Sequence, residues 1–318
     1  MLALSPSETH LTLDPRSQVD ASYFESYSYF TIHREMLGDA PRTVSYRDAL
    51  ERNPALLAGA KVLDVGCGTG ILSLFAARAG AAAVVGVDGS ARMAAVATAL
   101  VAANGYGPKP DGAPGPVRIV SGKFEELQSL PFDQFDVIVS EWMGYCLLFE
   151  SMLDTVLHAR DRFLKPGGAV LPDVATYYIA GVSREASGVP FWDDVYGFDF
   201  SHVGREMHGD ALNSRVARVL PVAGSALVTQ PAQFKSFDLT TMAASDVEFT
   251  SEFHLRPLAQ GGDVACAGVV VWFDTAFSAR FCAAAPVVLT TSPHAPATHW
   301  AQTLFDFKVR IRQIARRP

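Results

Sequence analysis

Two carboxylates stand beside an apolar core in the segment "SEWMGYCLLFE" at residues 140–150. Glu141 and Glu150 lie at either end of a mostly apolar, aromatic stretch, directly after "FDVIV", whose composition predicts a buried strand of a parallel sheet. Folds of that kind carry their chemistry at the carboxyl ends of the strands. Two ionised carboxylates there suit a forked cation such as a guanidinium, which they could grip and align. Two solvated acids on a loop rim are the alternative.

A second chemical signal is the glycine-rich segment "VLDVGCGTG" at residues 62–70. Glycines let the backbone approach a ligand closely, and the helix that follows offers its N-terminus. The G-x-G-x-G spacing differs from the G-x-G-x-x-G fingerprint of dinucleotide-binding folds. Asp88 ends the next strand, where its carboxylate could bind a ribose diol; an aspartate that merely caps the strand is the alternative. The pattern is similar to motif I of class I S-adenosylmethionine-dependent methyltransferases.

That resemblance implies S-adenosyl-L-methionine as the cofactor and gives a role to the two glutamates. In "SGKFEEL" it places Phe124 and Glu125 against the adenine, with Glu126 as the competing, solvated acid. A guanidinium is a poor methyl acceptor, because it stays charged and its lone pairs are delocalised. Two carboxylates would draw positive charge toward the nitrogens they grip, leave one nitrogen richer in electrons and align it for attack.

The longer segment "SEWMGYCLLFESML" resembles the double-E loop of protein arginine N-methyltransferases, and the likeness extends from "YFESYSYFTIHREMLGDAPRT" to "THW" at 298–300. The chain is similar to the type I enzymes. Its sequence most resembles the arginine methyltransferase 3 subgroup, without the zinc finger of that subgroup. The resemblance implies methylation of guanidino nitrogens in Gly/Arg-rich or histone-like proteins, giving monomethyl- and asymmetric dimethylarginine. The alternative is a catalytically impaired scaffold or binding protein with a truncated barrel.

The resemblance also assigns site residues one by one. Catalytic roles fall to Glu141, Glu150 and His299, with Asp39 orienting His299 for proton removal. Without the resemblance, the N-terminal aromatic residues would be a buried helix face, the methionines core filler and His299 structural. The sequence shows no metal-ligand spacing. The acceptor pocket would be bordered by Met36, Met143 and Trp300, and the cofactor would be bound by Phe24, Tyr27, His33, Met36, Arg42, Asp64, Gly66, Gly68, Asp88, Phe124 and Glu125. Of these, Arg42 would pair with the carboxylate of the cofactor.

Helices and strands that position these residues alternate in the first half of the chain. Strands are predicted at 60–66, 82–88, 117–122 and 135–141, with helices at 70–80 and 90–104 between them. The fold class is therefore α/β, with a Rossmann-like methyltransferase domain at 59–172. A flexible segment at 1–20 and a helical lid over the cofactor at 21–58 are expected to precede it.

Strand-like segments without long helices follow at 173–318 and predict an antiparallel β domain, most similar to a barrel. They include "ATYYIAGV", "SALVTQPAQFKSFDL", "DVEFTSEFHL", "CAGVVVWFDTAF" and "APVVLTTS". The aromatic segment at about 188–212 resembles a dimerisation arm and implies a homodimer. The resemblance implies further barrel strands after "THW", so we expect a C-terminus shorter than in the family. The alternating "FDFKVRIRQ" predicts one strand that could replace missing ones or leave an open edge.

Composition narrows the range of partners. The net charge of −7 argues against direct binding to nucleic-acid backbones. The four cysteines form no CxxC pair, the first residues lack the pattern of a signal peptide, and no apolar run approaches a membrane span. We therefore expect reduced thiols, no membrane partner and a cytoplasmic or nuclear location.

Overall fold

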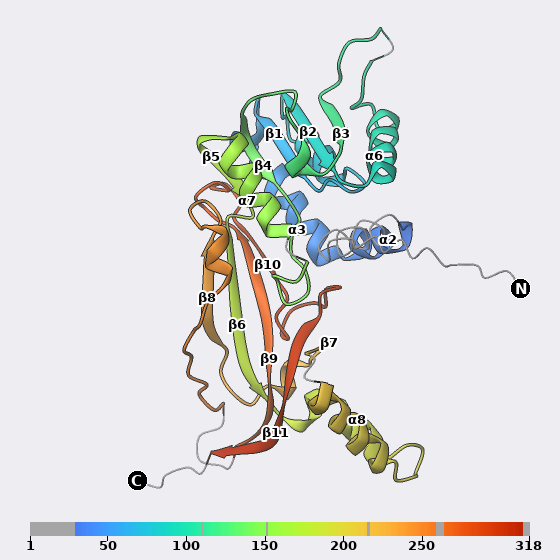
Figure 1. Ribbon diagram of the computed structural model, residues 1–318, viewed down its shortest axis with the longest axis vertical. Helices are drawn as coiled ribbons and strands as arrows, with labels where there is room; N and C mark the ends of the chain where they lie inside the picture. Colours follow the sequence, from blue (N-terminus) through green and yellow to red (C-terminus); the bar gives the residue numbers. More distant parts are fainter. Residues whose placement is uncertain (1–28, 110, 151, 215–216, 259–263, 314–318) are drawn as a thin grey trace, which may run out of the picture.

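The computed structural model describes residues 29–109, 111–150, 152–214, 217–258 and 264–313. A parallel sheet with its helices stands at one end of the molecule, and a long antiparallel sheet extends away from it (Figure 1). A helical excursion projects from the far end of the second sheet. Phe24, Tyr27 and the segment 1–20 lie outside the described residues, so their predicted roles stay predictions.

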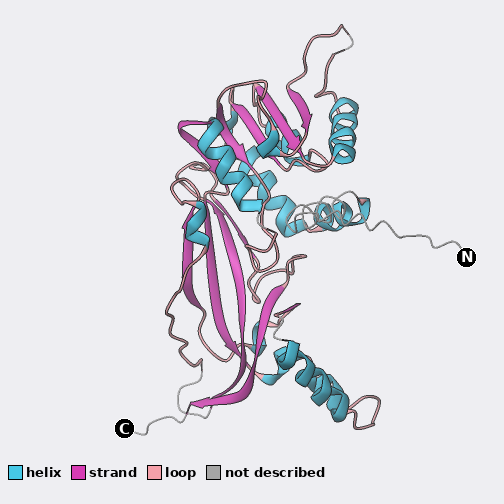
Figure 2. Ribbon diagram, viewed as in Figure 1, coloured by secondary structure: helices cyan, strands magenta, loops and turns pink. Residues whose placement is uncertain are grey.

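The first sheet has five parallel strands in the order β3-β2-β1-β4-β5. Its strands are β1 (Lys61–Val65), β2 (Ala83–Asp88), β3 (Val117–Ser121), β4 (Phe135–Val139) and β5 (Leu164–Leu171). Helices flank it (Figure 2): α5 (Ile71–Arg78), α6 (Ala91–Ala103) and α7 (Met152–Phe163). The strand order reverses between β1 and β4, and such a switch point opens a crevice at the carboxyl ends of the strands. The loops after β1, β2 and β4 therefore meet at one edge.

Three helices precede this sheet: α2 (Phe30–Gly38), α3 (Ala40–Glu51) and α4 (Pro54–Leu57). The Asp39 side chain accepts a hydrogen bond from the Arg42 N–H and so caps α3, which has Pro41 in its first turn. Tyr46 of α3 is fully buried and meets Phe277 of the antiparallel sheet edge to face, with 4.9 Å between ring centroids. Helix α3 thus joins the two sheets through a shared core.

The second sheet contains β6 (Val174–Val182), β7 (Arg218–Leu220), β8 (Ala232–Asp238), β9 (Val264–Phe277), β10 (Val287–Thr290) and β11 (Gln302–Gln313). Their order is β7-β11-β9-β6-β8, and β10 pairs with β9. The predicted C-terminal strand is present as β11, which runs antiparallel to β9 with one irregularity between Asp306 and Ile311. Within the described ranges, β7 and β8 form the two ends of this path.

One sequence expectation about local structure is wrong. The segment "DVEFTSEFHL" is a 3₁₀ turn (Ala244–Val247) followed by irregular chain, because Phe249 and Phe253 pack over the ring of Phe234 rather than along a neighbouring strand. Glu150 lies in a turn before α7 with φ 85°. Residues 166–168 lie within β5, whose pairing with β4 shifts register between Phe135 and Val137.

The segment expected to be a dimerisation arm, 188–212, forms a 3₁₀ helix (Val189–Asp193), a tight hairpin at Val195–Phe198 and most of α8 (Ser201–Ser214). It projects away from the antiparallel sheet (Figure 1). Its aromatic side chains are largely open to solvent: Tyr196 is 99% exposed, Phe198 68% and Phe191 63%. No helix in the described part of the chain is long and apolar enough to cross a membrane.

Candidate active site

A cavity of about 450 Å³ lies at the carboxyl ends of the parallel strands and reaches the N-terminal helices and the double-E loop. The structure brings most of the predicted site residues to it. Asp39 and Asp64 are not on its wall. Those that line it are His33, Met36, Arg42, Gly66, Gly68, Asp88, Phe124, Glu125, Glu141, Met143, Glu150, His299 and Trp300.

The glycine-rich turn requires glycine because of its backbone and its close neighbours. Gly66 and Gly68 have φ 72° and 53°, in the left-handed region. A Cβ at Gly66 would collide with the methyl group of Met152, and one at Gly68 would come 3.3 Å from the His33 ring. The turn therefore leaves its backbone open to a ligand on the cavity side.

Asp88 holds this turn in place. Its Oδ2 accepts a hydrogen bond from the Gly68 N–H (2.7 Å) and its Oδ1 one from the Ser90 N–H (2.8 Å). Burial raises the pKa of Asp88, and the two hydrogen bonds offset part of that effect. Each carboxylate oxygen has a second lone pair that can accept from a ligand.

Asp64 lies beneath the turn, fully buried, where its Oδ2 accepts a hydrogen bond from Ser73 Oγ (2.7 Å). Its Oδ1 has no hydrogen-bond partner among the described residues. Burial raises the pKa of Asp64 to about 7. The structure thus places Asp64 behind the glycine-rich turn rather than on the cavity wall.

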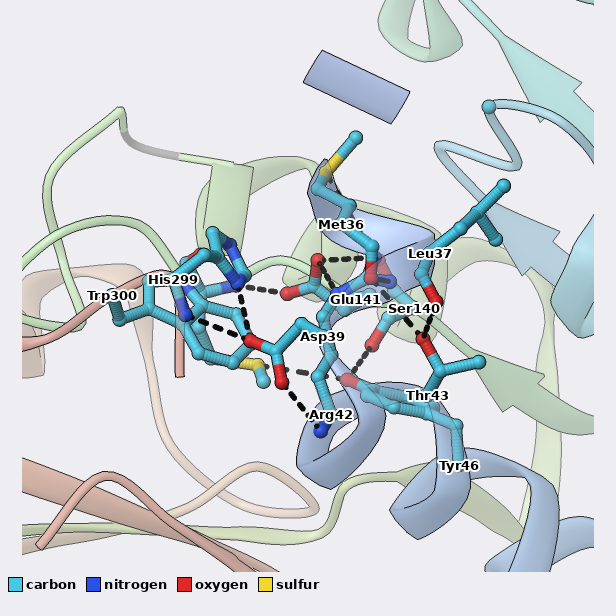
Figure 3. A network of polar contacts seen from close by, with 12 residues as sticks. Met36, Leu37, Asp39, Arg42, Thr43, Tyr46, Ser140, Glu141, His299 and Trp300 are labelled. Atoms are coloured by element: carbon cyan, nitrogen blue, oxygen red, sulfur yellow. Dashed lines mark hydrogen bonds and ion pairs between the residues drawn. The ribbon is translucent and has the colours of Figure 1, made fainter. Parts of the chain in front are cut away.

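Glu141 forms an ion pair with Arg42, and both side chains are 9% exposed. Its Oε2 accepts from Arg42 Nε (2.9 Å) and Nη2 (2.7 Å) (Figure 3). Its Oε1 accepts from the Met143 N–H (3.2 Å). Arg42 Nη1 also donates to the carbonyl of Met36 (3.1 Å). The resemblance assigned Arg42 to an incoming carboxylate; in this structure its carboxylate partner is Glu141.

Backbone carbonyls of the double-E loop accept hydrogen bonds from three aromatic side chains. Tyr46 of α3 donates to Ser140 (2.9 Å), and Trp300 Nε1 donates to Met143 (2.7 Å). Tyr177 of β6 donates to Cys146 (2.6 Å). Trp300, predicted as a wall of the acceptor pocket, therefore both lines the cavity and binds the loop.

His299 is oriented by Asp39, as the resemblance implied. Asp39 Oδ2 accepts from the His299 backbone N–H (2.9 Å) and lies 2.7 Å from its Nδ1 (Figure 3). Burial acts to raise the pKa of Asp39, but hydrogen bonds from His299 and Arg42 outweigh it and lower that pKa. An ionised carboxylate only accepts, so Nδ1 carries the hydrogen and Nε2 of a neutral His299 can accept a proton.

Several residues that contact or support the site were not predicted from the sequence. Thr155 of α7 donates a hydrogen bond to Glu125, and Met152 fills the space behind Gly66. Tyr46 and Tyr177 bind the double-E loop from two different domains. Only the helical spacing of α7, which puts Met152 and Thr155 on adjoining positions of one face, could have suggested the first two.

Comparisons with known proteins agree with this arrangement. The family model described as "Arginine methyltransferase oligomerization subdomain" matches residues 173–314, and one described as "Methyltransferase domain" matches residues 62–168. A "Probable protein arginine N-methyltransferase 3" of Oryza sativa subsp. japonica is 50% identical, covering 98% of this chain and 53% of that protein. "Protein arginine N-methyltransferase 1" of Saccharomyces cerevisiae is 42% identical, covering 92% of this chain and 79% of that protein.

A solved structure described as the Trypanosoma brucei PRMT1 enzyme-prozyme heterotetrameric complex with AdoHcy is also similar. It superposes with a TM-score of 0.76 at 42% identity, covering 91% of this chain and 86% of that one. The strand order, the glycine-rich turn and the two matched domains define a class I methyltransferase fold joined to an oligomerisation subdomain. The chain belongs to the protein arginine N-methyltransferase family. It spans about half the length of the rice relative.

Proposed function

We propose that this chain transfers methyl groups from S-adenosyl-L-methionine to the guanidino nitrogens of arginine in proteins, giving monomethyl- and asymmetric dimethylarginine. The observation that carries the proposal is the shared cavity: Glu141 and Glu150 line the same space as the glycine-rich turn and Asp88. The AdoHcy named with the trypanosome relative supports the cofactor, and the names of the relatives support the reaction.

The residues present fit this cofactor. A cavity of about 450 Å³ lies within the size range of small-molecule sites. Gly66 and Gly68 admit a ligand close to the backbone, Asp88 offers acceptor lone pairs for a diol, and Glu125 offers a carboxylate for an amino group. Phe124 is 4% exposed and adds an apolar wall. When bound, the cofactor supplies an electrophilic methyl group on a sulfonium.

The electrostatics of the cavity suit a cationic acceptor. Glu141, Glu150 and Arg42 together carry one net negative charge, and the side chains of Glu141 and Arg42 are largely shielded from solvent. A substrate guanidinium would balance that charge, and the two carboxylates would hold its nitrogens in a fixed plane. Positioning of this kind lowers the barrier because less orientational entropy is lost in the reaction.

Transfer to a guanidinium nitrogen releases one proton. His299 lines the cavity, and the Asp39 hydrogen bond leaves its Nε2 able to accept that proton. Asp39 acts through His299 and caps α3, so it is a positioning residue. The same ionised Asp39 stabilises the imidazolium that forms.

Mass spectrometry of a Gly/Arg-rich peptide, incubated with the protein and S-adenosyl-L-methionine, tests the function directly. Mass increases of one and two methyl groups on arginine are expected. Cofactor binding without any product would instead favour the alternative, a scaffold or binding protein of the same fold. A histone tail peptide offered in parallel would report on the class of substrate.

We expect Met36 to influence how far methylation proceeds. Met36 lines the cavity from α2, and its flexible thioether can yield space to a methylated arginine nitrogen. Met36→Phe should shift products toward monomethylarginine or the symmetric isomer, at a stability cost of about 1–3 kcal/mol for overpacking. Fragment-ion neutral losses distinguish the isomers. Met36→Leu, which conserves volume, is the control; unchanged product ratios in a folded Met36→Phe protein would contradict the prediction.

We further propose a homodimer formed through the segment 188–212. The description of the matching oligomerization subdomain supports it, and so do the exposed aromatic side chains of this segment.

The four cysteines are all free thiols, which supports a reducing location in the cytoplasm or nucleus.

Tyr196→Asn combined with Phe198→Ser should convert the dimer to a monomer. Both side chains are exposed, so the fold loses little, while buried interface aromatics contribute about 2 kcal/mol or more each. Asparagine tolerates the left-handed conformation of position 196, φ 54°. Light scattering reports the mass. Val288→Ser, at a 58% exposed position of β10, is the control, and a persistent dimer in the double variant would place the interface elsewhere.

A further inference from the structure

The turn between Glu141 and Glu150 has an unfavourable backbone. Cys146 and Leu147 follow one another with φ 47° and 65°, and neither is glycine. Consecutive left-handed residues of this kind are uncommon and persist only where surrounding contacts hold them. The Gly144 N–H donates to the Leu147 carbonyl (2.9 Å), which closes the turn but leaves open how the turn is anchored to the rest of the protein.

Tyr177 provides an anchor from the antiparallel sheet. Its hydroxyl donates to the Cys146 carbonyl at 2.6 Å, and the same carbonyl accepts from the Leu148 N–H at 2.7 Å. Tyr177 is 6% exposed, and its ring stacks on Phe234 of β8 with 5.2 Å between centroids. Strand β6 is paired on both sides, with β8 and β9, so the position of this hydroxyl is set by the sheet.

We infer that Tyr177 is a positioning residue for methyl transfer: it holds the double-E loop at Cys146 and thereby sets the placement of Glu150 relative to Glu141. Tyr46 and Trp300 bind the carbonyls of Ser140 and Met143, at the Glu141 end of the loop. Tyr177 binds farther along, toward Glu150. The inference rests on the proposed function, because its consequence is a change in the rate of arginine methylation.

A purely structural role for Tyr177 makes a different prediction. The ring contributes to the core through Phe234 and Phe237, and a phenylalanine at 177 would keep both contacts. The hydroxyl alone reaches the loop. Burial raises the pKa of Tyr177, so the hydroxyl remains a donor throughout the working pH range. Removal of the oxygen therefore separates loop positioning from core packing.

Tyr177→Phe is the test, and Tyr178→Phe is its matched control. Tyr178 is the next residue of β6, and its ring stacks on Trp272 with 5.8 Å between centroids, in the core cluster that does not include Tyr177. Three measurements are made: a cofactor titration for Kd, kinetics with a Gly/Arg-rich peptide for KM and for kcat per bound cofactor, and amide hydrogen exchange of residues 144–149. Expressing kcat per cofactor-binding site removes any effect of a smaller folded fraction.

Tyr177→Phe should lower kcat by about tenfold, with the cofactor Kd unchanged within about twofold, because the loop loses its anchor while the glycine-rich turn is untouched. Exchange at the Gly144 and Leu148 amides should become faster. Tyr178→Phe should match the wild-type protein in all three measurements.

Wild-type kcat in Tyr177→Phe, or unchanged exchange in the loop, would overturn the inference, as would an equal loss in Tyr178→Phe. If the wild-type protein transfers no methyl group to any arginine peptide, the proposed function fails instead. The exchange measurement then still decides whether Tyr177 holds the loop.

Discussion

Glu141→Gln should lower kcat for arginine methylation by about 10²–10³-fold, an effect of the size seen when one charge-stabilising group is removed from an active site. The substitution keeps the shape of the side chain and removes one of the two negative charges that would grip the guanidinium. A carboxamide also presents an NH₂ donor to the substrate or to the loop, where a carboxylate only accepts. The affinity for S-adenosyl-L-methionine should change little, because the glycine-rich turn and Asp88 are unaffected.

Glu141→Gln needs a control for the stability of the fold, because Glu141 forms an ion pair with the buried Arg42. Breaking a buried ion pair is costly, although glutamine keeps one acceptor oxygen for the guanidinium. Thermal unfolding and a cofactor titration show whether the variant is folded and competent to bind. Glu252→Gln, at an exposed position of the antiparallel domain, makes the same change in net charge. Near wild-type turnover by a folded Glu141→Gln protein would contradict the double-carboxylate mechanism.

Asp88→Ala should raise the cofactor Kd by about 30- to 100-fold, with kcat at saturating cofactor much less affected. Two charge-assisted hydrogen bonds to a ribose diol would be lost, each of about 1.5–3 kcal/mol before solvent compensates. The structure adds a second reason: the Gly68 and Ser90 N–H groups would lose their acceptor, so the glycine-rich turn would loosen. Calorimetric titration measures the affinity.

Asp88→Asn separates these two contributions. It keeps one carbonyl oxygen for the Gly68 or Ser90 N–H group and removes the charge, so a smaller loss of affinity is expected than with alanine. Unchanged affinity in both variants would reject Asp88 as the ribose ligand. The two sets of variants also control one another, because Glu141→Gln should act on turnover and Asp88→Ala on cofactor affinity.

Much of the methyltransferase domain could be predicted from the sequence because its signals are local. Strand β1 and the turn after it lie within nine residues of one another, and both the apolar run and the glycines at positive φ are visible as residue types. Glu141 and Glu150 lie in one loop, so their presence at the same strand end follows from the chain itself. The resemblance of that loop to a family then added roles that residue types alone do not carry.

Other features depended on contacts between distant parts of the chain. Asp39 and His299 are 260 residues apart, and Arg42 and Glu141 are 99 apart. The segment "DVEFTSEFHL" has strand-like residues, yet the packing of Phe249 and Phe253 on Phe234 determines its path. Strand β7 has three residues, too few for a periodic pattern.

Tyr177 and Tyr178 illustrate the difference between what the sequence predicts and what the tertiary structure decides. The composition of "ATYYIAGV" predicts a strand, and successive side chains of a strand point to opposite faces, so the two tyrosines should face opposite sides. Which of them reaches Cys146 depends on the pairing of β6 with β8 and β9 and on where α3 joins the two sheets. The sequence by itself determined most strands of the parallel sheet, the glycine-rich turn and the two acids, because backbone conformation responds to local residue types. Only the tertiary structure decided which side chains meet, because hydrogen bonds and ion pairs depend on distances of about 3 Å that no local pattern specifies.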